Sequence, residues 1–273
     1  INWCVVAAAC PAWAAKVFPD LKSEEAVEKL WKAVFETTRA TQPDPVAAWQ
    51  EHIKNLKKRS EYLQARKYSA LHFKGPGTDF TLGLPQGHKW ISAQSLAENG
   101  VVFTANMPTE EVFTLPDRHR ADGTVAATFP LSYGGSLIED FSVTFENGRI
   151  VKVNAKKNEA ILQRLIDTDE GSKHLGEIAL VPASSPIAQR GHLFYNTLFD
   201  ENASCHIAIG RAYRFTLTGG EELTEEEFVA AGGNVSLNHV DFMIGSPQMD
   251  IDGIKQDGAR EPVMRQGEWA FDA

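Results

Sequence analysis

Apolar and polar residues follow two different periods along this chain, and the change falls near Tyr68. Up to that point apolar side chains recur every three or four positions, the spacing that lines one face of a helix. A short apolar run at the start has the length of a buried strand instead. The pattern therefore predicts a strand over Asn2 to Ala9, followed by helices over Pro11 to Val17, Glu24 to Thr38 and Pro45 to Tyr68.

Beyond Ser69 the period moves toward two, as in strands with one buried face. Asn147-Gly148 separates two such runs and favours a two-residue hairpin turn. Helical spacing returns over Glu159 to Asp167 and Ala203 to Arg211. The predicted strands are Tyr68 to Lys74, Asp79 to Leu82, Val101 to Ala105, Gly123 to Tyr133, Leu137 to Phe145 and His239 to Ile244. We therefore expect an α+β fold of mixed sheets with flanking helices, with a domain boundary near residue 68.

The composition is that of a globular protein, and the charge and hydropathy argue against some classes of binding partner. The chain has 273 residues, of which 43% are hydrophobic and 23% charged, and a net charge of −9, which argues against nucleic acid. The uncharged run from Trp3 to Ala15 is too short to span a bilayer, so no membrane is expected. The three cysteines, Cys4, Cys10 and Cys205, lack metal spacing and cannot all pair, which predicts a cytoplasmic protein.

One segment concentrates candidate chemistry around a predicted helix start. Asp200 or Asn202 can cap that helix by accepting hydrogen bonds from its first amides. His206 and Tyr213 are seven residues apart, so on a helix they would project from nearly the same face. Glu201, just before the first turn, can reach the same side. The segment suggests a metal site.

Three further places carry potential ligands. On a strand, His239 and Asp241 point the same way, which makes a compact donor pair for a divalent cation. Glu111 and Glu177 each stand among hydrophobic residues, where an unpaired charge is costly. The alternative for His239 is an ordinary hydrogen-bonded core histidine.

The charges of the candidate ligands suggest that these segments form one site. If Glu111, Glu177, Glu201 and Asp241 converge, they carry four negative charges that two divalent cations would neutralise, with two neutral imidazoles completing the ligand set. The alternative is four separate acids on the surface or in salt bridges. Spacing by itself does not decide, because the chain has no short metal motif such as His-Glu-x-x-His.

Other motifs are weaker. Asp250-Ile251-Asp252-Gly253 lacks the glycine position and closing glutamate of a calcium loop, so turns between short strands are expected there. Gly75-Pro76-Gly77 lacks the Gly-Lys-Ser/Thr end of a phosphate loop, and no Gly-x-Ser-x-Gly is present. Helix neighbours such as Cys205 and His206 diverge by about 100°, which opposes a thiolate and base pair.

Five collinear segments resemble one family, the thermophilic, PepS-type aminopeptidases of metallopeptidase family twenty-nine. The likeness reaches from Asn2 to about Trp269. It also suggests that this chain lacks a leading portion, so that residues 1–68 would be the remainder of a truncated N-terminal α/β domain and residues 69–273 the catalytic metal-binding domain. The segments are Gly77 to Pro85, Ala105 to Thr114, Asp169 to Glu177, Asn196 to Asn202 and His239 to Gly245.

The resemblance implies a dinuclear metal site, with Glu177 as the bridging ligand. Tyr213 matches a tyrosine of the same site, and Glu110 is the candidate general base. Because adjacent residues in an extended segment face opposite ways, Glu110 is equally well an acid that supports the site or faces solvent. The donors suit Zn or Co best, with Mn or Mg as alternatives. The implied ligands are Glu111, Glu177, Glu201, His206, His239 and Asp241.

The function that follows is a metal-dependent aminopeptidase acting on peptides with a free N-terminus through a metal-activated water. The resemblance further implies a homodimer. Tyr213 would donate a hydrogen bond to the developing oxyanion, unless it is simply a buried tyrosine with a satisfied hydroxyl. Two alternatives stay open: a dinuclear metal phosphoesterase, and a fragment that binds metal without turnover.

Overall fold

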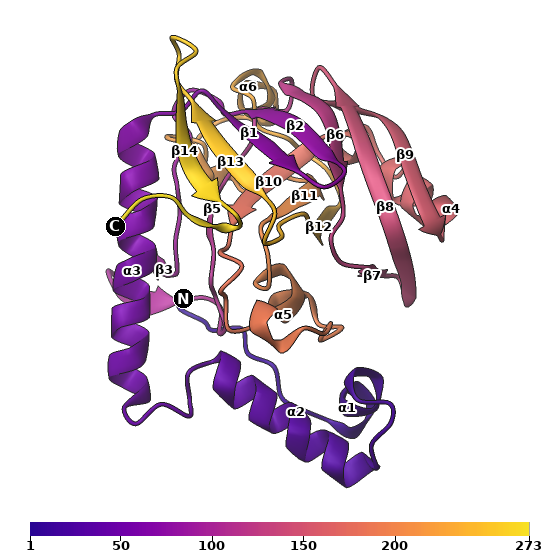
Figure 1. Ribbon diagram of the computed structural model, residues 1–273. Helices are drawn as coiled ribbons and strands as arrows, with labels where there is room; N and C mark the ends of the chain where they lie inside the picture. The colour runs from indigo at the N-terminus through magenta and orange to yellow at the C-terminus, as the bar shows by residue number, and fades with distance from the viewer. Residues whose placement is uncertain (273) are drawn as a thin grey trace.

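The computed structural model describes residues 1–272. Three helices precede the first strand and match the predicted positions within two residues (Figure 1). The Asp44 side chain caps the third helix by accepting a hydrogen bond from the Ala47 amide at 3.0 Å, and Lys67 ends it in the left-handed conformation. These helices are α1 (Pro11–Val17), α2 (Ser23–Thr37) and α3 (Pro45–Arg66).

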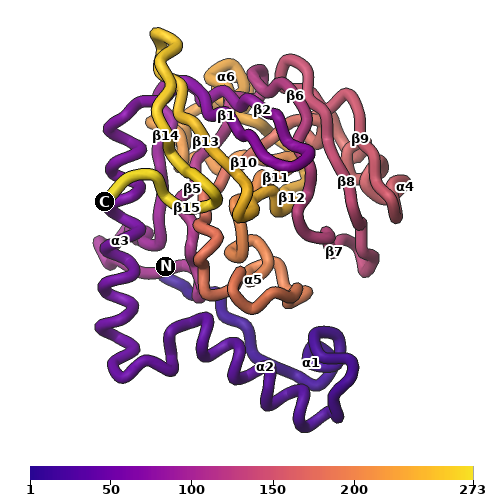
Figure 2. The backbone as a smooth tube through the Cα atoms, in the orientation of Figure 1, coloured from indigo at the N-terminus to yellow at the C-terminus, as the bar shows by residue number. Residues whose placement is uncertain are grey.

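Nine antiparallel strands form the larger sheet, in the order β15-β14-β13-β1-β2-β6-β8-β7, with β9 paired to β8. Strand β13, from the end of the chain, pairs with β1, so that Phe73 lies opposite Ile251 (Figure 2). The strands are β1 (Ala70–Gly75), β2 (Thr78–Gly83), β6 (Ala121–Ala126), β7 (Leu131–Tyr133), β8 (Ser136–Glu146), β9 (Arg149–Lys157), β13 (Asp250–Ile254), β14 (Arg260–Arg265) and β15 (Glu268–Trp269).

A smaller sheet of four antiparallel strands has the order β12-β11-β10-β5. Its strands are β5 (Val112–Thr114), β10 (Leu175–Leu180), β11 (His206–Gly210) and β12 (His239–Met243). The remaining elements are the hairpin β3 (Gln94–Leu96) and β4 (Val102–Thr104), and helices α4 (Glu159–Ile166), α5 (Thr197–Glu201) and α6 (Glu225–Ala230). Sheets and helices together confirm the predicted α+β class.

The main core joins the two sheets. Phe141 of β8 contacts Phe242 of β12, with ring centroids 5.2 Å apart, and both side chains are buried. A second hydrophobic cluster joins the first helices to the segment around α5, with Leu30 of α2 beside Phe194 and Phe199 (Figure 1). The helical segment is thereby fixed to the same region as the predicted metal ligands. The domain boundary near residue 68 stays a prediction.

The helix predicted over Ala203 to Arg211 is wrong. The structure has strand β11 there, hydrogen-bonded to β10 on one side and β12 on the other, with all five residues buried. A short apolar run buried on both faces has no periodicity to separate helix from strand, and the β-branched Ile207 and Ile209 suit the sheet. His206 and Tyr213 therefore do not share a helix face.

Three other predictions also need correction. The segment Asn2 to Ala9 forms no strand among the described residues; it has one bridge, Val5 to Asn106, and is largely exposed. The strand predicted over Gly123 to Tyr133 is two strands, β6 and β7, separated near Pro130. Asp250 to Gly253 lies in strand β13 where turns were expected.

The predicted hairpin at Asn147-Gly148 is confirmed between β8 and β9. Both turn residues have positive φ, 49° and 81°, as this kind of tight turn requires. Within residues 1–272 no helix is both long and apolar enough to cross a membrane.

We predict that Gly148→Ala destabilises the fold more than Gly100→Ala. Both glycines have φ near 80°, which costs alanine about 1–2 kcal/mol. Only at Gly148 would a Cβ meet backbone, 1.9 Å from the Arg118 carbonyl oxygen, which adds about 1–3 kcal/mol of strain. Thermal melting of the two variants tests this; equal melting temperatures would contradict it.

Candidate metal centre

The register of the smaller sheet places predicted ligands on one face. Ala208 of β11 lies opposite Glu177 of β10 on one side and opposite Asp241 of β12 on the other. Directly opposed residues share a face, as do residues two apart on one strand, so His206 and His239 belong to the same face. The small Ala208 side chain leaves room between the two carboxylates.

Five of the six predicted ligands meet there. His206 Nε2 lies 3.1 Å from Glu111 Oε2 and 3.6 Å from Glu177 Oε1. His239 Nε2 lies 3.9 Å from Glu177 Oε2 and 3.6 Å from Asp241 Oδ2. The result is two groups of three ligand atoms, each within 4.8 Å of one another, which share Glu177.

Both imidazoles are oriented for metal binding. The Nδ1 of His206 lies 3.0 Å from the Ser204 carbonyl oxygen, and that of His239 lies 2.7 Å from the Arg211 carbonyl oxygen. A carbonyl only accepts, so each Nδ1 carries a proton, and the Nε2 of the neutral ring would present its lone pair to the carboxylates. Lone pairs that face carboxylates repel unless a cation or a proton lies between them.

Burial intensifies this repulsion. Burial, together with the charges of Asp241 and Glu111, raises the pKa of Glu177 to about 7. Burial lowers the pKa of His206, but Glu111 and Glu177 outweigh it and hold that pKa well above its ordinary value.

Two oxygens of the cluster, Glu111 Oε2 and Asp241 Oδ1, are buried without a hydrogen-bond partner. Such groups are costly unless a cation compensates them. Carboxylates and neutral imidazoles without thiolates fit a divalent cation.

Glu201, the sixth predicted ligand, lies at the end of α5 and belongs to neither group of three. Burial raises its pKa well above the ordinary value, and the charges of Asp241 and Glu111 raise it further, so its carboxylate is electrostatically part of the cluster. Its role as a ligand stays a prediction.

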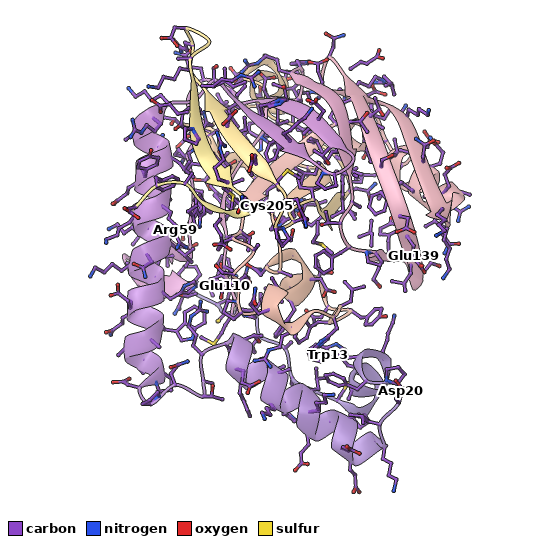
Figure 3. The ribbon with its side chains drawn as sticks, viewed as in Figure 1. Trp13, Asp20, Arg59, Glu110, Glu139 and Cys205 are labelled. Atoms are coloured by element: carbon purple, nitrogen blue, oxygen red, sulfur yellow. The ribbon has the colours of Figure 1, made fainter. Side chains whose placement is uncertain are left out.

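The two predicted catalytic residues, Glu110 and Tyr213, have different neighbours. The carboxylate of Glu110, which is labelled in Figure 3, pairs with Arg39 at 2.5 and 2.9 Å, whereas Glu111 faces His206. Tyr213 lies just after β11, and its ring contacts the ring of His239 with centroids 4.8 Å apart. Burial, with the charges of Glu177 and Asp241, raises the pKa of Tyr213 to about 12, so the hydroxyl keeps its proton.

Sequence reasoning missed the residues that hold Glu110. Arg39 and His52 come from the helical segment, and the Asn202 side chain accepts a hydrogen bond from the Glu110 amide at 2.7 Å. Arg39 has a positive φ of 61° just after α2, where glycine is favoured.

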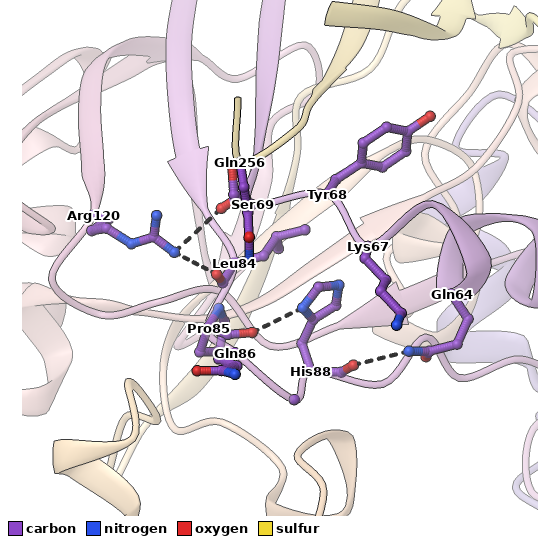
Figure 4. Close-up of a pocket in the computed structure, with 11 residues that line it drawn as sticks. Gln64, Lys67, Tyr68, Ser69, Leu84, Pro85, Gln86, His88, Arg120 and Gln256 are labelled. Atoms are coloured by element: carbon purple, nitrogen blue, oxygen red, sulfur yellow. Dashed lines mark hydrogen bonds between the residues drawn. The ribbon is translucent and has the colours of Figure 1, made fainter. Parts of the chain in front are cut away.

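A cavity of about 800 Å³ contains none of the predicted site residues (Figure 4). His88 donates there to the Pro85 carbonyl oxygen, and Arg120 donates to the carbonyls of Ser69 and Leu84. A smaller cavity of about 60 Å³ is lined by Glu201 and Asp241. The small cavity, unlike the larger one, borders the candidate metal centre, and Asp241 Oδ1 there has no hydrogen-bond partner.

Acids and imidazoles gathered on one face of a small antiparallel sheet define the class, an α+β protein with a site for divalent metal. The chain belongs to the thermophilic metalloprotease (M29) family, whose model matches residues 1–269. This confirms the family resemblance of the sequence segments.

Proteins that are similar to this chain over nearly its whole length are named aminopeptidases. The chain is 55% identical to aminopeptidase AmpS of Bacillus subtilis over 99% of its length, and 52% identical to aminopeptidase T of Thermus thermophilus over 98%. It spans 66% and 65% of the length of these relatives. The solved structure of wild-type AmpT from Thermus thermophilus matches 99% of this chain and 65% of its own, with a TM-score of 0.93 and 51% identity.

We predict that Glu177→Gln changes how the stability of the metal-free protein depends on pH. The pKa of Glu177 is about 7 when folded and roughly 4.3 in an unfolded chain, so the folded state binds more protons between these values. Stability from this group is therefore present at low pH and lost as pH rises toward 7. The raised pKa of His206 acts in the same direction.

Melting in the presence of chelator from pH 5 to 7.5 tests this. As the pH rises, the melting temperature of the wild type should fall relative to that of Glu177→Gln, which lacks the titrating carboxyl. Buried histidines whose pKa values are lowered are present in both proteins, so their effects cancel in the comparison. Parallel pH curves would contradict the prediction.

Proposed function

We propose that this chain carries the catalytic centre of a metal-dependent aminopeptidase, which removes N-terminal amino acids from peptides. The observation that carries the proposal is the pair of ligand groups sharing Glu177, in a chain of the M29 family. Relatives that are 55%, 53% and 52% identical are named aminopeptidases.

We propose two divalent cations, with Glu177 between them. Zn or Co fits the mixed carboxylate and imidazole donors best, and Mn or Mg is also compatible. When bound, such a pair polarises a peptide carbonyl and lowers the pKa of a nearby water. The residues proposed to hold the cations are Glu111, Glu177, Glu201, His206, His239 and Asp241.

The side chains around the cluster suggest the remaining roles. The protonated Tyr213 hydroxyl is a hydrogen-bond donor for the oxygen that becomes negative during attack. Glu110 stays the sequence-based candidate for the group that takes a proton from water and returns it to the leaving amine, although its carboxylate faces Arg39 and that of Glu111 faces His206. The Glu110 carboxylate is oriented by Arg39.

The aminopeptidase proposal is favoured over the phosphoesterase alternative because the named relatives are aminopeptidases. A cytoplasmic location is proposed from the cysteines, which are all free, and a homodimer from the family resemblance.

Removal of divalent metal should abolish peptide cleavage. We expect activity on an aminoacyl chromogenic amide to disappear after dialysis against chelator and to return with Zn or Co, because only cations compensate the buried acids. Activity that is indifferent to chelation would reject the proposal. Restored metal binding without turnover would identify a chain that binds metal but does not catalyse.

Tyr213→Phe should lower kcat about 10²- to 10³-fold with little change in KM, since the lost hydroxyl acts on the developing oxyanion. Tyr62→Phe is the control, because Tyr62 stacks on Phe271 in another part of the molecule. Steady-state kinetics on both variants tests the role. An unchanged kcat for Tyr213→Phe would rule it out.

A further inference from the structure

Glu110, beside the cluster, is an acid that the protein compensates with an arginine. It is 4% exposed, and each carboxylate oxygen accepts a hydrogen bond from a different nitrogen of Arg39, at 2.5 and 2.9 Å. This two-point pairing fixes both the position and the plane of the carboxylate. Its neighbour Glu111 faces His206 instead.

Arg39 is itself held on several sides. His52 of α3 lies with Nδ1 3.1 Å from the Arg39 guanidinium and Nε2 2.7 Å from the Thr109 carbonyl oxygen. A carbonyl only accepts, so Nε2 carries the proton and Nδ1 accepts from Arg39. The guanidinium also lies 5.7 Å from the centre of the Trp49 ring, whose Nε1 donates to the Thr38 carbonyl oxygen at 2.7 Å.

The same network reaches two of the segments that carry proposed metal ligands, those of Glu111 and Glu201. The Glu110 amide donates to Asn202 Oδ1 at 2.7 Å, and Asn202 Nδ2 donates to the Leu198 carbonyl oxygen of α5 at 2.9 Å. Glu110 precedes Glu111, and Asn202 follows Glu201. One hydrogen bond therefore ties the backbone amide of the residue before Glu111 to the side chain of the residue after Glu201.

We propose that Arg39 is a positioning residue that acts through Glu110, by holding the segment from Thr109 to Glu111 against Asn202 so that Glu111 and Glu201 face the metal. The proposal rests on the proposed metal centre and gives the helical segment a part in it. Loss of Arg39 would leave Glu110 buried without its partner, and the segment would rearrange to bring that carboxylate to water.

The first test is metal affinity, measured by titration of the metal-free protein with Zn and by the visible absorption of bound Co. We expect Arg39→Gln to weaken binding about 10- to 100-fold, the usual effect of removing a group that orients ligands. Arg39→Lys keeps the charge but not the two-point geometry, so it should restore the affinity only in part. If Arg39→Gln does not fold, the metal affinity of Arg39→Lys tests the proposal in its place.

Arg190→Gln is the matched control, because Arg190 pairs with Glu36 of α2 at 2.8 Å and contacts no predicted ligand. It should leave affinity and the Co spectrum unchanged while lowering the melting temperature slightly. The second readout is kinetic: Arg39→Gln should lower kcat with KM within about twofold of the wild type, measured at saturating metal.

Arg39 is merely structural if Arg39→Gln matches Arg190→Gln in affinity, spectrum and kcat. The proposed function can fail separately. If the wild type binds metal but cleaves no peptide, the aminopeptidase proposal falls, while the metal titration still decides the role of Arg39.

Discussion

Uncompensated negative charge on a buried sheet face is the constraint on which this molecule depends. Glu111, Glu177 and Asp241 converge on two imidazoles whose protons are already committed to backbone carbonyls. Among the residues described, no lysine or arginine side chain pairs with these carboxylates to neutralise them. A proton or a metal must do so, which explains why the pKa of Glu177 rises to about 7.

The rest of the fold holds the ligands of that face in position. Three strands of the smaller sheet bring ligands from segments far apart in sequence into one register, and the larger sheet covers the opposite side with an aromatic and aliphatic core. A rigid frame matters here, because acids that repel one another would otherwise turn toward water. Packing energy thus holds in place a site that electrostatics opposes.

Glu110 and Glu111 show how neighbouring acids receive different environments. An extended backbone directs them to opposite sides, one toward Arg39 and the other toward His206. The first is neutralised within the protein, and the second remains open to a cation. The helical segment before the first strand is therefore connected to the centre by charge as well as by the hydrophobic cluster around Phe199.

The sequence by itself determined the helices before Tyr68, the Asn147-Gly148 turn and the ligand types, because helical spacing, turn chemistry and family motifs are local properties. It did not determine that His206 begins a strand, since an apolar run buried on both faces has no distinguishing period. Nor did it indicate Arg39 as the partner of Glu110, a pairing across 71 positions that only the packing of α2 and α3 against the ligand segments creates. The tertiary structure decided which acids are compensated, because compensation depends on distance in space.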